Sequence, residues 1–215
     1  MVMDISTNGK YVGDNIDLFQ HLVDNGYGHF VRLKSPVFSE NGDHKKPIDK
    51  DWLNRPLRKG RVIYENGYGL GFHPYENCLV VDVDDPHPDL QRWLETNHYP
   101  YGLTPRGGIH MVFLLEDGDP LPSIVGNRTG VWVEGVGKCD FRQRGQICIS
   151  PDAGYRWVPY TPKPLPQRLR SFIYNAVQKP TPPSPNGNGN GEGRTSANTI
   201  YKAVEAFANG EVVEE

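Results

Sequence analysis

The hydrophobic positions of the chain alternate with polar ones in short runs through its middle, and follow a helical period towards its two ends. Apolar residues recur every three or four positions over 14–25, over 88–97 and after Pro166, which predicts an amphipathic helix in each segment. Short runs of β-branched and aromatic residues predict strands at 29–33, 67–73, 78–85, 101–103, 109–115, 131–134, 138–142, 146–149 and 155–158. Because strands dominate the middle and helices flank them, the sequence predicts an α+β fold with a largely antiparallel sheet.

Polar and turn-forming residues interrupt the predicted strands and set the end of the chain apart from the rest. Loops are expected at 34–50 and 116–129. The segment 179–198 is rich in Pro, Gly, Asn and Ser and cannot bury a core, so it is expected to be a linker. A short helical tail is expected at 199–215, which leaves 1–178 as the folded domain.

Two local predictions concern shorter segments. A short helix is expected around 52–57, directly after the first polar loop. Arg144 and Gly145 form a turn signal between 138–142 and 146–149, which predicts that these two strands pair as a hairpin. Alternation along the first of them places three polar side chains on one face: Lys138, Asp140 and Arg142.

Composition limits the classes of protein to which the chain can belong. The formal net charge is −3, with 23 Lys and Arg against 26 Asp and Glu, so any contact with nucleic acid must be local or bridged by a metal ion. Cys78, Cys139 and Cys148 lack the spacing of a zinc site and lie in apolar segments, which fits a reducing compartment. No run approaches the ~18 apolar residues of a membrane span, and the first residues lack a secretory pattern. We therefore expect a cytoplasmic protein that does not enter a membrane.

The strand at 78–85 ends in the candidate functional motif of the chain. Because side chains alternate along a strand, Asp82 and Asp84 are expected on one face, and the apolar residues between and before them on the core face. Two adjacent carboxylates repel each other, and a divalent cation removes that repulsion; hard oxygen ligands suit Mg²⁺ or Mn²⁺. A strand that ends in a solvated acidic turn explains the same residues, and the motif by itself favours that simpler interpretation.

Further residues, taken together, favour a functional site over a solvated acidic turn. His110 follows Gly107 and Gly108, and Asp140 lies two residues before Arg142. Alone, His110 could be a partly buried histidine with its partners satisfied, Asp140 could belong to a surface ion pair, and Arg106 could be a loop charge. Together they supply what nucleotidyl transfer needs: carboxylates hold two divalent ions that activate the attacking hydroxyl and stabilise the leaving pyrophosphate. Histidine and arginine donors neutralise the triphosphate, and glycines let the backbone approach it.

The order of these motifs resembles the archaeo-eukaryotic primase superfamily, and within it the bifunctional primase/polymerase (prim-pol) domain at the N-terminus of phage and plasmid replication proteins. The order is hydrophobic-Asp-x-Asp, then Gly-Gly-x-His, then hydrophobic-Asp, and the resemblance covers about Tyr11 to Phe172. The wider pattern shared with that domain comprises Lys46-Pro47 followed by Trp52, Gly69-Leu70-Gly71, Thr104-Pro105-Arg106-Gly107-Gly108-Ile109-His110, and Ile149-Ser150-Pro151.

The resemblance implies a DNA primase or DNA polymerase with an RRM-like catalytic sheet and a smaller N-terminal α/β subdomain. It implies two Mg²⁺ or Mn²⁺ ions on Asp82, Asp84 and Asp140. It also implies that His110 binds the incoming triphosphate, with four residues beside it: Arg106, Gly107, Gly108 and Arg142. The expected partners are a single-stranded DNA template and primer, a dNTP or NTP, and a helicase domain in the same or a partner polypeptide. We expect a monomer, in the host cytoplasm if a phage encodes it.

The sequence departs from the resemblance in two places, and three other classes share parts of its pattern. It has no Cys/His zinc-binding insertion and no helicase motif, which puts zinc-dependent priming in doubt. A glycosyltransferase with an Asp-x-Asp motif would need neither the Gly-Gly-x-His motif nor Asp140. A nicking nuclease needs a His-hydrophobe-His pair, and here only His110 is present. A catalytically inactive nucleic-acid-binding module would not need the complete set of acids.

Overall fold

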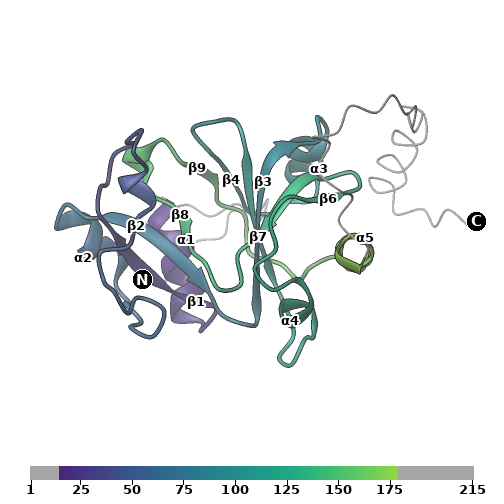
Figure 1. Ribbon diagram of the computed structural model, residues 1–215, viewed down its shortest axis with the longest axis horizontal. Helices are drawn as coiled ribbons and strands as arrows, with labels where there is room; N and C mark the ends of the chain where they lie inside the picture. Colours follow the sequence, from purple (N-terminus) through teal and green to yellow (C-terminus); the bar gives the residue numbers. More distant parts are fainter. Residues whose placement is uncertain (1–14, 179–215) are drawn as a thin grey trace, which may run out of the picture.

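The computed structural model describes residues 15–178, which contain helices, short 3₁₀ turns and nine strands (Figure 1). The first part comprises α1 (Asn15–Asp24), β1 (Gly28–Leu33), η1 (Asp43–Lys45), α2 (Gly60–Glu65) and β2 (Gly69–Pro74). The middle comprises β3 (Cys78–Pro86), α3 (Leu90–Thr96), β4 (Tyr101–Leu103), β5 (Ile109–Leu114), α4 (Leu121–Val125) and β6 (Val131–Val133). The last part comprises β7 (Gly137–Phe141), β8 (Ile147–Cys148), η2 (Pro151–Ala153), β9 (Arg156–Val158) and α5 (Gln167–Gln178).

The strands form two antiparallel sheets (Figure 1). Helices α3, α4 and α5 pack on one face of the larger sheet, and α1 packs on its other face in the core that the two sheets share. The larger sheet has the order β6-β7-β3-β5-β4-β9, and the smaller one has the order β1-β2-β8. The predicted α+β class with antiparallel pairing is therefore confirmed. The predicted linker at 179–198 and tail at 199–215 lie outside the described residues. No helix within residues 15–178 is long and apolar enough to cross a membrane.

Strand β3 contributes to a separate hydrophobic core on each face of the larger sheet. Leu79, Val81 and Val83 are buried against α3, α4 and α5. Cys78 and Val80 point the other way and pack with α1, β1 and β2. This continuous apolar run therefore reflects a strand that is covered on both faces over its first half. Asp82 follows on the face of Val80, where the smaller sheet no longer covers β3 completely.

The predicted hairpin at 138–149 is wrong, because its two strands belong to different sheets. β7 pairs with β3 in the larger sheet, whereas β8 pairs with β2 in the smaller one. The connecting residues are held at separate places: the Arg142 amide donates to the Val80 carbonyl, and the Gly145 carbonyl accepts a hydrogen bond from His73 Nδ1. The chain therefore crosses from one sheet to the other at this turn.

The helix predicted at 52–57 is also wrong. Asn54 and Asp51 instead close a turn through a backbone bond and a side-chain bond of 2.8 Å, and Pro56 has no N–H for a helical bond. Two short helices were not predicted: α2 follows this segment, and α4 lies inside the predicted loop at 116–129. The other predicted helices and strands lie within a few residues of their predicted bounds.

The three cysteines are free and buried, as the sequence predicts. Burial raises the pKa of the thiols of Cys78, Cys139 and Cys148. Because the thiolate is the reactive form of cysteine, none of the three is poised as a nucleophile. They act as small apolar residues of the core.

Candidate active site

Three of the predicted site residues lie in one row across the centre of the larger sheet. Asp82 on β3 stands directly opposite His110 on β5 and directly opposite Asp140 on β7. Residues opposite each other on neighbouring antiparallel strands project from the same face with their Cβ atoms close together. The pairing register thus brings together side chains that come from three separate motifs of the sequence.

Arg142 joins the two carboxylates of this row. Its Nη2 donates to Asp82 Oδ2 at 3.0 Å and to Asp140 Oδ2 at 2.8 Å. The second oxygen of each carboxylate has another partner: Asp82 Oδ1 lies 3.2 Å from His110 Nε2, and Asp140 Oδ1 accepts the Gly130 amide at 2.8 Å. Both oxygens of each acid are therefore engaged, and a positive charge lies between the acids.

The two acids are mostly shielded from water, which strengthens these contacts. Their side chains are 13% and 14% exposed for Asp82 and Asp140. Burial by itself raises the pKa of Asp82, but the hydrogen bonds and charges of His110 and Arg142 outweigh it and lower the pKa to about 2. Asp82 is therefore fully ionised near neutral pH.

His110 is the most enclosed member of the row. The residue is 4% exposed, and its Nδ1 is buried without a hydrogen-bond partner among the described residues. Its ring stacks on Tyr155, with centroids 5.6 Å apart and planes inclined by 26°. Its Nε2 faces Asp82, so a contact from that nitrogen to a triphosphate would require an exchange of partners.

A β-bulge in β3 changes the expected arrangement of the acidic motif. Val83 pairs with Cys139, but the next paired residue is Asp85, which stands opposite Lys138. Asp84 is the inserted residue, so strict alternation breaks there. Because Lys138 and Asp140 are two positions apart on β7, Asp85 is brought to the face of the acidic row. Asp84 is exposed, and no hydrogen bond or ion pair within residues 15–178 joins it to Asp82.

The Gly-Gly turn packs directly against this bulge. Gly107 has φ +85°, a left-handed conformation that favours glycine. A Cβ on Gly108 would lie 2.8 Å from the Val83 carbonyl oxygen, so only glycine allows this close approach. The turn is closed by the Gly108 amide, which donates to Thr104 Oγ1 at 2.9 Å. Arg106 is exposed at the tip of the turn.

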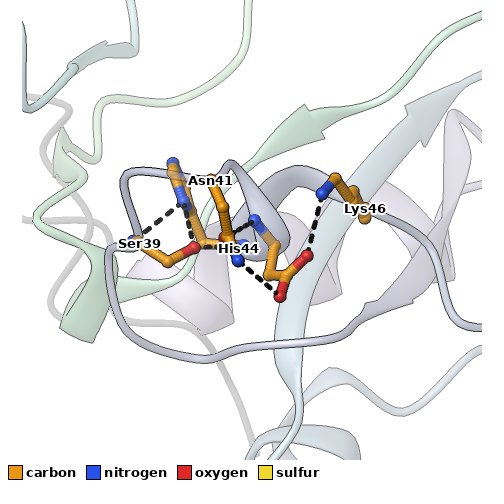
Figure 2. A network of polar contacts seen from close by, with 5 residues as sticks. Ser39, Asn41, His44 and Lys46 are labelled. Carbon is orange, nitrogen blue, oxygen red and sulfur yellow. Dashed lines mark hydrogen bonds and ion pairs between the residues drawn. The ribbon is translucent and has the colours of Figure 1, made fainter.

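The loop between β1 and α2 carries a network of polar contacts (Figure 2). Within it, Ser39 donates its amide to His44 Nδ1 at 3.1 Å, and Lys46 pairs with Asp43 at 3.0 Å. His44 is buried, and its ring lies 6.4 Å from that of Tyr155, which in turn stacks on His110. The pKa of His44 is lowered, first by burial and further by the positive charges of Lys45 and Arg106. These rings connect the loop to the acidic row.

The donor set of the row suits a divalent cation, although the side chains are not arranged as a finished metal site. Within residues 15–178, no three His, Cys, Asp or Glu side chains converge closely enough to hold a metal ion as they stand. The Arg142 guanidinium nevertheless takes the position between Asp82 and Asp140 that a cation would occupy. Carboxylate oxygens are the ligands that Mg²⁺ and Mn²⁺ prefer. The residues therefore fit such an ion once Arg142 has moved away.

A scan against protein-family models finds no match, and a search of curated proteins finds none either. The structure brings Asp82, Asp140, His110 and Arg142 into contact, and it places Arg106, Gly107 and Gly108 at a neighbouring turn. Sequence reasoning missed Asp85 and Tyr155, because only strand register and tertiary packing bring them to the row.

Proposed function

We propose that the chain is a metal-dependent nucleotidyl transferase. One observation carries the proposal: Asp82 and Asp140 lie side by side on adjacent central strands and share one bound positive charge, while His110 flanks Asp82 on the other side. Two carboxylates around a cation position, with arginine and histidine side chains beside them, are what a nucleoside triphosphate and its divalent ions require.

Within this class, we infer a template-directed DNA primase or DNA polymerase of the prim-pol type, as in phage and plasmid replication. The order of the motifs and the spacing between them support this narrower function. An antiparallel sheet with helices on one face is compatible with an RRM-like catalytic sheet, and the smaller sheet with α1 and α2 is compatible with the N-terminal subdomain. The expected substrates are a primed single-stranded template and a dNTP or NTP.

Asp82 and Asp140 would hold the divalent ions. The resemblance assigns Asp84 as the third ligand, whereas the bulge brings Asp85 to the face of the row. When bound there, Mg²⁺ or Mn²⁺ supplies the charge that activates a 3′-hydroxyl and stabilises the pyrophosphate leaving group. His110 orients Asp82 through its 3.2 Å contact in the absence of nucleotide, and its Nε2 would exchange Asp82 for a phosphate oxygen when the triphosphate binds. Arg142 leaves the carboxylates, and its planar guanidinium then pairs with phosphate oxygens in the same forked geometry. Arg106 and the amides of the Gly-Gly turn lie beside β3, where the triphosphate would approach.

The direct test is extension of a labelled primer on a DNA template with dNTPs and Mg²⁺ or Mn²⁺. The wild-type chain is expected to add nucleotides, and Asp82→Ala and Asp140→Ala are each expected to abolish addition. Asp117→Ala is the matched control, because Asp117 is an exposed aspartate in a loop outside the row. Extension by the double variant Asp82→Ala/Asp140→Ala at the wild-type rate would refute the assignment.

One observation favours a second candidate, a catalytically inactive nucleic-acid-binding module. Arg142 already neutralises both acids, so the row is stable as an ion-pair network without a metal. The same assay separates the two candidates when it is combined with a binding measurement. Binding of single-stranded DNA without nucleotide addition under either metal would establish the binding module instead.

A further inference from the structure

Trp132 is an exposed aromatic residue in a well-packed strand. Its exposed fraction is 65%, the largest among the exposed bulky apolar residues of the described part of the chain. Its neighbour Val133 is fully buried, and Val131 packs against the same core. The exposure of the indole therefore does not come from a loose strand. Alternation along β6 turns this one side chain away from the core and into solvent.

The indole projects from the face of the sheet that carries the acidic row. Trp132 stands directly opposite Lys138 on β7, and Lys138 is two positions from Asp140, so all three share a face. Strand spacings of ~4.8 Å and a rise of ~3.4 Å per residue place the Cα atoms of Trp132 and Asp140 about 8 Å apart. Lys138 is exposed and supplies a positive charge between the indole and the row.

The same hydrogen bonds that hold Asp140 also fix Trp132 relative to it. Asp140 Oδ1 accepts the amide of Gly130, two residues before Trp132, at 2.8 Å. The Phe141 amide donates to the Arg128 carbonyl at 2.8 Å, and the Val136 amide donates to the Val133 carbonyl at 3.1 Å. The hairpin of β6 and β7 is thus tied at both ends, and the indole sits at a set distance from the row.

The residues of this hairpin include more basic than acidic side chains in a chain whose net charge is negative, and Asp85 on β3 stands opposite Lys138. Residues 127–146 contain four basic side chains, Arg128, Lys138, Arg142 and Arg144, and two acidic ones, Glu134 and Asp140, against −3 for the whole chain. An exposed indole beside a lysine suits a strand with flat bases and phosphates, because a base can stack on the ring while the lysine meets a phosphate. An apolar protein surface would not pair with these charges.

We propose that Trp132 and Lys138 form a binding platform for single-stranded nucleic acid, on which a base of the template stacks next to the acidic row. The platform lies within a few nucleotides of Asp140, because stacked bases rise about 3.4 Å along a strand. The platform would hold the template strand beside the acidic row. This inference rests on the proposed function only for naming the bound strand as the template.

The platform is tested by fluorescence anisotropy of labelled oligo(dT) of about 16 nucleotides with the full chain and no nucleotide. Trp132→Ala is expected to weaken binding about 5- to 150-fold, the equivalent of about 1–3 kcal/mol. Trp132→Phe, which keeps a ring, should retain most of the affinity. Lys138→Ala should flatten the slope of log K against log salt by about 0.7, whereas Trp132→Ala should leave that slope unchanged.

The matched control is Tyr174→Ala. Tyr174 is an exposed aromatic residue, 44% exposed, on α5, and α5 packs against the other face of the larger sheet. This variant should bind oligo(dT) as the wild type does. Unchanged binding by Trp132→Ala, or no binding by the wild type, would overturn the platform. So would a change of oligomeric state in Trp132→Ala by sedimentation with DNA binding unaltered, since that would make β6 a protein interface.

Failure of the platform and failure of the proposed function give different results. If the wild type extends primers while Trp132→Ala keeps the wild-type KM for template, the platform is wrong and the function stands. If the wild type binds oligo(dT) through Trp132 but adds no nucleotide, the platform stands and the function is wrong. Thermal unfolding of each variant verifies that these exposed substitutions leave the fold intact.

Discussion

Replacing Asp82 by asparagine should destabilise the metal-free protein, although simple repulsion between neighbouring acids predicts the opposite. Asp82 is ionised, 13% exposed and bonded to both Arg142 and His110. These partners lower its pKa from 3.8 to about 2. At about 1.36 kcal/mol for each pKa unit, the difference corresponds to about 2 kcal/mol of folding free energy near neutral pH. The Asp82→Asn side chain would keep the shape of the carboxylate but lose that contribution.

The pH dependence of this loss follows from the direction of the pKa change. A carboxyl whose pKa is lower in the folded state stabilises the fold above its unfolded pKa, and this contribution is lost as pH falls through the folded pKa. The gap in stability between wild type and Asp82→Asn should therefore be full above about pH 4 and shrink between about pH 4 and pH 2. Arg142 stays charged throughout this range.

Urea unfolding in EDTA at pH 7 and at pH 3 measures the gap directly. EDTA keeps divalent ions off the carboxylates, and Asp117→Asn serves as the control for loss of an exposed aspartate. The expected result is a lower urea midpoint for Asp82→Asn at pH 7 and a smaller difference at pH 3. Equal midpoints at pH 7, or a gap that does not shrink on acidification, would refute the reasoning.

Three further predictions concern the residues around the acids and the end of the chain. Arg142→Ala should tighten Mn²⁺ binding, measured by calorimetry, because the competing cation is gone, while it lowers stability without metal; weaker Mn²⁺ binding would contradict this. His110→Ala should raise the KM for dNTP about ten- to a hundredfold with oligo(dT) affinity unchanged, and a loss of template affinity at an unchanged KM for dNTP would place His110 elsewhere. A chain that ends at Gln178 should keep full extension activity, since every residue of the row precedes that point; a folded but inactive truncation would assign a role to the removed segment.

The sequence predicts the strands that carry the acids because burial and alternation are local properties. The hydrophobic run before Asp82 and the alternation of polar and apolar residues around Asp140 place both residues on strands, and the Gly-Gly turn before His110 marks the start of a third. That these strands are neighbours does not follow from periodicity, and only the order of the motifs suggested it. The pairing register brings Asp82, Asp140 and His110 to adjacent positions.

What the sequence could not predict depends on long-range pairing. The bulge at Asp84 arises where β3 meets β7, and nothing in the local pattern distinguishes Asp84 from Asp85. The turn at Arg144 looks like that of a hairpin, but hydrogen bonds to two different sheets decide the path of the chain. Alternation along 138–142 placed Arg142 on the face of Asp140, but its contact with Asp82 depends on the pairing of β7 with β3. Each miss is a case in which tertiary contacts override a local signal.

The ion pairs of Arg142 connect the stability of the fold with the availability of the site. While the guanidinium occupies the position between Asp82 and Asp140, the row is electrically balanced, and a divalent cation must displace it to bind. The ion pairs of Arg142 stabilise the protein without metal, and a divalent ion must break them to bind. The binding-competent state is therefore only partly populated, which weakens the apparent affinity for the ion. A triphosphate that arrives with its ion offers Arg142 a new anionic partner, so the two exchanges favour each other. The arrangement would therefore admit metal and nucleotide together more readily than metal alone.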